Sequence, residues 1–143
     1  MKTIVITGAS AGIGRALALE FARRGYRLGL LGRRVDALAS LQQETLACGA
    51  TAAITGQLDV DAAESVAPQL QRVFQGLGTV DIFVANAGIN AFTNVGKDEL
   101  VAEARIIQTN VVGAIASIDA AAAHFIEQNR GHIVGVSSLA SMI

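Results

Sequence analysis

The sequence has few of the residues on which disulfide, metal-bound or disordered proteins depend. Its 143 residues include one cysteine, one proline and no tryptophan. A single cysteine, Cys48, excludes an intramolecular disulfide and a cysteine-based metal cluster. His124 and His132 are not at a metal-ligand spacing, so we expect no metal site. Charged residues make up only 16% and hydrophobic residues 52%, which excludes an intrinsically disordered chain.

Charge of either sign is also sparse. Eleven lysines and arginines oppose twelve aspartates and glutamates, which gives a net charge of −1 at pH 7. Nucleic acids and anionic membranes attract basic surfaces, so we expect neither as a partner. The apolar run after Lys2 is too short for a signal peptide, and the longest uncharged stretch of an expected helix, residues 106–118, falls short of a bilayer span. We therefore expect a cytoplasmic protein whose partners are small molecules.

Short apolar runs alternate with longer segments of helical periodicity, a pattern typical of a parallel sheet with crossover helices. The expected strands are residues 3–7, 27–31, 53–58, 80–85 and 132–137. Residues 98–129 predict one long helix, continuous or broken, because they have a single apolar side. That side is made of Ile107, Val111, Ala114, Ile118, Ala122 and Phe125. We expect one α/β domain over residues 1–143.

The first expected strand-to-helix turn is rich in glycine. Residues 7–14 read Thr-Gly-Ala-Ser-Ala-Gly-Ile-Gly. Glycines there allow a tight turn and let backbone N–H groups and a helix N-terminus approach a pyrophosphate. No Gly-Lys-Ser/Thr follows, so the turn is not a Walker loop, and its glycine spacing differs from G-x-G-x-x-G. The candidate cofactor-binding residues in this turn are Gly8, Ser10, Ala11, Gly12, Ile13 and Gly14.

Further segments follow this turn in a fixed order. Asp59-Val60 comes after the third expected strand, Asn86-Ala87-Gly88 after the fourth and Ser137-Ser138 at the end of the fifth, while Asn110 lies in the long helix. Together with the Thr-Gly turn they resemble the short-chain dehydrogenase/reductase family, and the resemblance covers the chain from Lys2 to Ile143. It implies a Rossmann-type doubly wound parallel sheet with five strands in the order 3-2-1-4-5. It also implies a homo-oligomeric oxidoreductase that transfers hydride between a nicotinamide cofactor and a small-molecule carbonyl or alcohol substrate.

The resemblance also implies roles for these residues. Asp59 and Val60 would contact the adenine, and residues 86–88 would pass close to the cofactor. Asn110 would be the catalytic asparagine that holds a water in a proton relay, and Ser138 would be the catalytic serine that hydrogen-bonds the substrate oxygen. Simpler interpretations remain open: Asp59 as a turn residue, Asn110 as a locally satisfied polar residue, and Ser137 or Ser141 in place of Ser138.

The choice of cofactor depends on the end of the second expected strand, which reads Gly32-Arg33-Arg34. A fold that prefers NAD places an acidic residue there for the ribose 2′-OH, whereas an arginine accommodates the 2′-phosphate of NADP. No carboxylate precedes Asp36, and two guanidinium groups can bind a phosphate through charge-assisted hydrogen bonds. The sequence therefore favours NADP(H) over NAD. For Arg34, a solvated position at the start of the next helix is the alternative.

In this family the general acid is a tyrosine in a Tyr-x-x-x-Lys pattern that follows the catalytic serine, and the lysine favours the ionised phenol. Tyr26 is the only tyrosine of this sequence and has no such lysine. We therefore expect residues 1–143 to be the N-terminal part of an NADP(H)-dependent reductase, inactive alone, with an exposed apolar edge strand and helix face. The alternative is a non-catalytic dinucleotide-binding or interaction module that is complete at residue 143.

Overall fold

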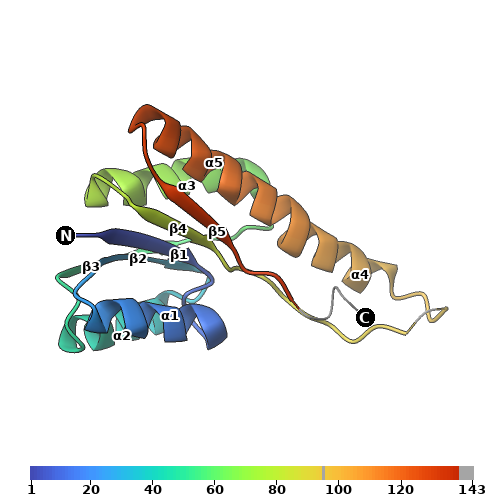
Figure 1. Ribbon diagram of the computed structural model, residues 1–143. Coiled ribbons are helices and arrows are strands. Elements are labelled where there is room, and N and C mark those ends of the chain that lie inside the picture. The colour runs from blue at the N-terminus through green and yellow to red at the C-terminus, as the bar shows by residue number, and fades with distance from the viewer. Residues whose placement is uncertain (95, 139–143) are drawn as a thin grey trace.

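The computed structural model describes residues 1–94 and 96–138. Five parallel strands form one sheet in the order β3-β2-β1-β4-β5 (Figure 1). The strands are β1 (Thr3–Thr7), β2 (Arg27–Gly32), β3 (Ala52–Gln57), β4 (Ile82–Ala85) and β5 (His132–Gly135). This order confirms the doubly wound α/β fold that the family resemblance implied.

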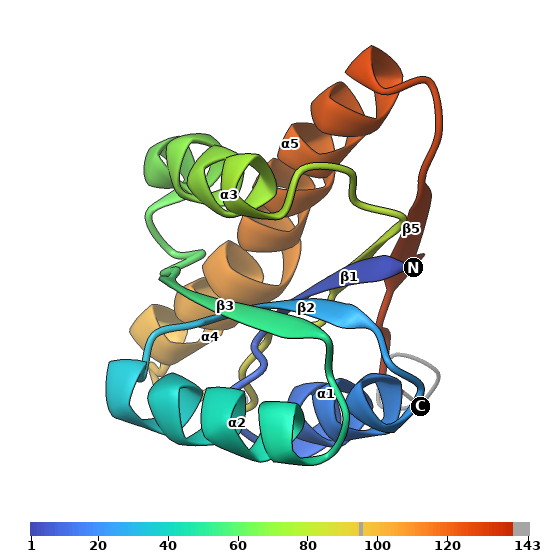
Figure 2. The ribbon, with the colours of Figure 1, turned by 90° about the vertical axis from the view of Figure 1, so that its left-hand side faces the viewer.

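Helices cover both faces of the sheet (Figures 1 and 2). On one face lie α1 (Gly12–Arg23) and α2 (Val35–Ala47), and on the other lie α3 (Ala63–Leu77) and α5 (Gly113–Glu127). The run that ends in α5 begins with α4 (Leu100–Ile107) and continues through a π-helical turn, η1 (Gln108–Val112). The long helix expected over residues 98–129 is therefore continuous, with one change of winding.

The central strand β1 shows why the inner strands have near-continuous apolar runs. All five of its residues are buried. Successive side chains point to opposite faces of a sheet, so Ile4 and Ile6 pack in the cluster with α1 and α2. Val5 packs in the cluster with α3 and α5. Helices on both faces therefore require a continuous apolar run rather than an alternating one.

Four of the strands differ slightly from the expected bounds, and β2 differs only in extending to Gly32. β4 begins at Ile82 rather than at residue 80, because the Val80 backbone bonds the side chain of Gln128 instead of a strand: its N–H donates to Oε1 at 3.3 Å and its C=O accepts from Nε2 at 2.5 Å. β3 spans residues 52–57 rather than 53–58, and β5 ends at Gly135 rather than at residue 137. These differences lie at strand ends and leave the sheet order unchanged.

The buried side of the long helix is only partly the one that we expected: Phe125 is buried and Ala114, Ile118 and Ala122 are half-buried, but the first two expected residues are not. Ile107 and Val111 are 57% and 46% exposed. The buried positions are instead mostly small residues: Thr109, Gly113, Ser117, Ala121 and Phe125. Small residues let a helix approach its neighbours closely, and a Cβ added at Gly113 would lie 2.7 Å from the Cβ of Val60. Close packing at Thr109 and Gly113 therefore leaves Ile107 and Val111 facing outward.

The length of this run also corrects an expectation. Leu100–Glu127 has 28 residues and a mean hydropathy of 1.4 in its most apolar window, so by length and composition alone it could cross a membrane. Our estimate from the sequence counted only the uncharged stretch 106–118 and was too short. In the structure the run connects β4 to β5 and packs beside α3, which is the arrangement of a crossover helix (Figure 1).

Candidate functional site

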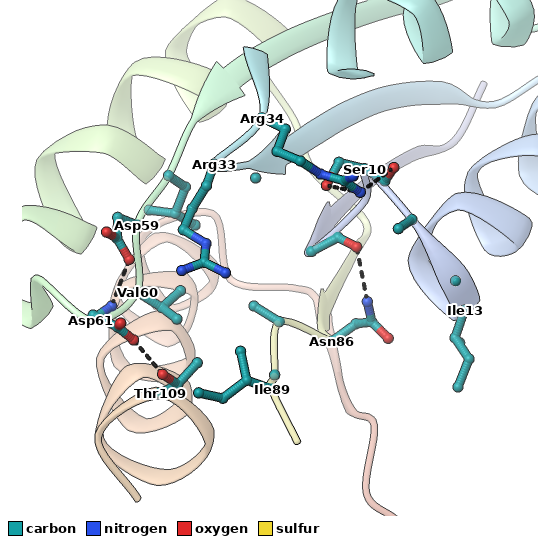
Figure 3. Close-up of a pocket in the computed structure, with 17 residues that line it drawn as sticks. Ser10, Ile13, Arg33, Arg34, Asp59, Val60, Asp61, Asn86, Ile89 and Thr109 are labelled. Carbon is teal, nitrogen blue, oxygen red and sulfur yellow. Dashed lines mark hydrogen bonds between the residues drawn. The ribbon is translucent and has the colours of Figure 1, made fainter. Parts of the chain in front are cut away.

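A cavity of about 440 Å³ lies at the carboxyl ends of β1, β2 and β4 and beside the segment that follows β3 (Figure 3). The chain runs outward from β1 to β3 and then crosses back to β4, so the order of strands reverses here, the usual ligand site of an open α/β sheet. The lining residues are Gly8, Ser10, Ala11, Gly12, Ile13, Gly32, Arg33, Arg34, Leu58, Asp59, Val60, Asp61, Asn86, Ala87, Gly88, Ile89 and Thr109.

Most candidate residues from the sequence meet in this cavity. Every candidate cofactor-binding residue except Gly14 lines it, whereas the candidate catalytic residues Asn110 and Ser138 do not. The lining residues that the sequence analysis missed are Gly32, Leu58, Asp61, Ile89 and Thr109. Each of them is the sequence neighbour of a candidate residue. Sequence motifs therefore located the segments better than the individual side chains.

The glycines of the first turn serve different purposes. Gly8 and Gly12 have φ angles of +65° and +53°, which favour glycine. Gly8 also touches the segment after β4, because a Cβ there would lie 2.8 Å from the Cα of Ala87. A Cβ at Gly14 would overlap the Gly8 carbonyl oxygen and lie 2.6 Å from Nδ2 of Asn86. Gly14 thus permits helix–strand packing rather than contact with a ligand.

Thr7 holds the glycine-rich turn against the segment after β4, a role that the sequence analysis missed. Its hydroxyl oxygen accepts the backbone N–H groups of Asn86 and Ala87, both at 3.0 Å, and lies 3.3 Å from the Val84 carbonyl. The Asn86 side chain completes the contact, since Nδ2 donates to the carbonyls of Thr7 at 3.0 Å and Gly8 at 3.3 Å. Two walls of the cavity are therefore fixed to each other.

The two arginines at the end of β2 behave differently. Arg34 donates from Nη2 to the Ser10 carbonyl at 3.1 Å and lies 3.4 Å from the Ser10 hydroxyl, so it is not merely a solvated residue at a helix start. Arg33 makes no hydrogen bond or ion pair within residues 1–94 and 96–138, and its guanidinium points into the cavity (Figure 3). A free guanidinium in a cavity is a ready partner for an anion.

Asp59 and Val60 form the wall beyond β3. The Asp61 N–H donates to Oδ1 of Asp59 at 3.1 Å, so Asp59 is a turn residue as well as a lining residue. Val60 is buried and packs against Gly113. Asp59 therefore both forms a turn and lines the cavity, and its contact with adenine stays a prediction.

Asn110 lies on η1 and bonds the backbone of Ile89 in both directions. Its Oδ1 accepts the Ile89 N–H and its Nδ2 donates to the Ile89 carbonyl, both at 2.8 Å. The amide is therefore satisfied locally, as the simpler interpretation held, and it fixes the end of the segment 86–89. π-Helical turns occur frequently at functional sites, and the catalytic role of Asn110 stays a prediction.

Ser137 and Ser138 follow β5 and are exposed, and Ser141 lies outside the described residues. Tyr26 precedes β2, at the amino-terminal ends of the strands, whereas the cavity lies at their carboxyl ends. Its ring packs edge-to-face on Phe21, with ring centroids 4.9 Å apart. It is therefore too far from the cavity to act there. No group of three or more histidine, cysteine, aspartate or glutamate residues that could hold a metal occurs in residues 1–94 and 96–138.

Comparison with known proteins identifies the family. The family model described as short chain dehydrogenase matches residues 2–143. An uncharacterized oxidoreductase of Myxococcus xanthus is 42% identical over 139 residues, which cover 97% of this chain and 54% of that protein. The chain belongs to the short-chain dehydrogenase family.

Two solved structures extend this finding to three dimensions. A xylitol dehydrogenase crystallised with NAD⁺ bound has a TM-score of 0.92 and 32% identity, over 99% of this chain and 54% of that one. An alcohol dehydrogenase from Thermococcus sibiricus, complexed with 5-hydroxy-NADP, has a TM-score of 0.85 and 34% identity, over 93% and 57%. The chain thus spans little more than half the length of these relatives, and the two structures carry different cofactor types.

Proposed function

We propose that residues 1–143 bind NADP(H) in the cavity described above, and that the protein as a whole transfers hydride between this cofactor and a small-molecule carbonyl or alcohol. The observation that carries the proposal is the free guanidinium of Arg33 in a cavity that also contains a helix N-terminus. Hydride transfer is proposed for the whole protein because the relatives are nearly twice as long.

The N-terminus of α1 supports a site for the pyrophosphate. The first N–H groups of a helix have no partner within it, and they attract anions together with the helix dipole. Ala11 at the N-cap has no side-chain acceptor, so no cap of its own competes with a ligand. Gly12 has no neighbouring atom within 4 Å of a Cβ position, which leaves room for a phosphate. The residues present therefore fit a dinucleotide.

The end of β2 supports NADP(H) rather than NAD. Arg33 is unpaired among the residues that the structure describes, and Arg34 is next to it on the Ser10 side of the cavity. Both are available for charge-assisted hydrogen bonds to a 2′-phosphate. The carboxylates that line the cavity, Asp59 and Asp61, follow β3, the strand that pairs with β2. The guanidinium of Arg33 would bind the 2′-phosphate, and the Asp59 carboxylate on the neighbouring segment would accept a hydrogen bond from the exocyclic amine of the adenine.

Bound nicotinamide would supply or accept the hydride, and the chain would hold it in place. Residues 86–89 form the wall that Thr7 and Asn110 fix from two sides, so this segment would orient the ring. Ser138 would donate a hydrogen bond to the substrate oxygen, and Asn110 would take part in proton transfer. The proposal includes a homo-oligomer in the cytoplasm. Its alternative is a dinucleotide-binding module without catalysis, which the local satisfaction of Asn110 favours.

The variant Arg33→Ala tests cofactor binding. Because Arg33 has no hydrogen bond or ion pair in the described part of the chain, its loss should leave the fold intact and remove only the contact to the 2′-phosphate. Hydrogen bonds to charged groups contribute about 1.5–3 kcal/mol, so the dissociation constant of NADPH should rise about 10- to 100-fold. That of NADH should change less than about twofold. Isothermal titration of the 143-residue chain measures both values.

Arg23→Ala is the matched control, because Arg23 is a largely exposed arginine at the other end of α1 from the cavity and pairs only with Glu20. It should alter neither constant. Equal losses of NADPH and NADH affinity in Arg33→Ala would contradict NADP(H) preference. Undetectable binding of either cofactor by the unchanged chain would contradict the dinucleotide site itself.

A further inference from the structure

Asp61 follows the proposed adenine-contacting pair and has every polar group engaged. Its N–H donates to Asp59, and its carbonyl accepts from Nε2 of Gln108 at 3.0 Å. Its Oδ1 accepts the hydroxyl of Thr109, and its Oδ2 lies 3.5 Å from Nε of Arg105 (Figure 3 shows the bond to Thr109). Three residues of the long helical run thus converge on one aspartate of the loop after β3.

Asn110, the residue after Thr109 in η1, contacts the opposite wall of the cavity. Thr109 contacts Asp61, and its neighbour Asn110 contacts Ile89 through two hydrogen bonds of 2.8 Å. Asp61 and Ile89 both line the cavity, from the segments after β3 and after β4. Thr109 and Asn110 are consecutive residues of the π-turn η1, so this turn connects the segment after β3 to the segment after β4. Thr109 itself is buried.

We propose that Asp61 is a positioning residue that acts through Thr109 on Asn110 and so fixes the Ile89 end of the cavity. The proposal rests on the proposed function, since it links the adenine side of that site to its nicotinamide side. A carboxylate suits the task because it only accepts hydrogen bonds and takes the hydroxyl of Thr109 and the charge of Arg105 on separate oxygens. If Thr109 shifts, Asn110 shifts with it, and the Ile89 N–H loses its acceptor.

Hydrogen exchange of the Ile89 amide tests the linkage without any cofactor. Thr109→Val removes the hydroxyl and keeps the shape, whereas Thr109→Ser keeps the hydroxyl. In the 143-residue chain we expect Ile89 exchange to accelerate about tenfold in Thr109→Val, the effect of losing one hydrogen-bonded contact, and to stay near the original rate in Thr109→Ser. The amide of Val5, in the fully buried β1, reports overall stability, so the acceleration at Ile89 is compared with that at Val5 in the same variant.

The variant Asp61→Ala and its double with Thr109→Val show whether Asp61 acts through Thr109. If it does, Ile89 exchange in the double variant equals that in either single variant, since the second change removes a contact already lost. Unchanged Ile89 exchange in Thr109→Val, or equal acceleration in Thr109→Val and Thr109→Ser, would overturn the proposal. Should Asp61→Ala fail to fold, the valine and serine variants still decide the question.

Ligand binding gives a second readout. In the proposed site NADPH would reach both walls, whereas 2′,5′-ADP contains only the adenosine end. Thr109→Val should weaken NADPH several-fold and 2′,5′-ADP less than twofold. Equal weakening of both would mean that Thr109 acts only at the adenine side. Failure of both ligands to bind the unchanged chain would count against the proposed function and leave the exchange result to decide the linkage.

Discussion

Gly8 and Gly12 share a positive φ angle but have different surroundings. A Cβ at Gly8 would lie 2.8 Å from the Cα of Ala87, and one at Gly12 would meet nothing within 4 Å. The left-handed conformation costs a side chain about 1–2 kcal/mol, and forcing an atom into a packed contact costs about 1–3 kcal/mol more. A side chain at Gly12 would therefore meet backbone strain alone, whereas a side chain at Gly8 would meet both backbone strain and steric overlap.

We predict that Gly8→Ala lowers the free energy of unfolding by about 2–4 kcal/mol and Gly12→Ala by about 1–2 kcal/mol. Urea denaturation followed by circular dichroism measures both. The same loss in the two variants would show that the contact between Gly8 and Ala87 is not tight. A larger loss in Gly12→Ala would contradict the assignment of the two roles.

Single residues were predictable from the sequence where chemistry and local spacing coincide. The glycines of the first turn and Arg33 belong to such a segment. Thr7 and Asp61 do not, because their partners lie far along the chain: Thr7 bonds Asn86, 79 residues away, and Asp61 bonds Thr109, 48 residues away. Only the fold brings these pairs together.

At the scale of elements, the approach of α5 to the loop after β3 depends on Gly113. A Cβ there would lie 2.7 Å from the Cβ of Val60 and 2.8 Å from its backbone oxygen. Gly76, inside α3, offers a contrast, because its Cβ would meet only the end of the flexible Ile54 side chain, at 3.0 Å. Alanine favours a helix over glycine by about 1 kcal/mol at either position.

We predict that Gly113→Ala destabilises the protein by about 1–2 kcal/mol, because the overlap with Val60 exceeds the gain in helix propensity. Gly76→Ala, the control, should be neutral or stabilising by up to about 1 kcal/mol. Thermal unfolding measured by calorimetry compares the two. Stabilisation by Gly113→Ala would show that α5 can move away from the loop at no cost.

Elements were predictable in kind and order, and less so in their contacts. Apolar runs located all five strands, because a sheet covered on both faces admits few polar residues. The buried side of the long helix was only partly predictable from hydrophobicity: Phe125 is buried as expected, but Gly113, Ser117 and Ala121 pack by being small. The start of β4 depended on the side chain of Gln128, whose effect on Val80 no local pattern reveals.

The whole molecule leaves apolar surface uncovered along the long helix. Ile107, Val111 and Ile115 form an outward stripe at intervals of four residues, and Ile115 is 63% exposed. At the adjacent edge of the sheet, β5 pairs with β4 on one side only. Contiguous apolar surface and an unpaired strand edge both favour association.

We predict that the 143-residue chain self-associates and that Ile115→Lys weakens the association at least about tenfold, since burial of an isoleucine contributes about 1.5–3 kcal/mol. Sedimentation velocity over a range of protein concentrations measures the strength of self-association. Leu46→Lys is the control, because Leu46 is an exposed apolar residue of α2, on the other face of the sheet. A chain that stays monomeric at high concentration would contradict the prediction.

The pairing of β1 with both β2 and β4 has a consequence for synthesis of the chain. β2 follows β1 closely in the sequence, but Ile4 also pairs with Ile82 of β4. The β4 edge of the central strand therefore has no partner until almost 80 more residues have been made. At 5–20 residues per second, a ribosome needs about 4–16 s to make that stretch. During this time the buried edge of β1 is open to other chains. The contacts between Thr7 and Asn86 form only when β4 pairs with β1, so the proposed dinucleotide site is complete only after the centre of the sheet has formed.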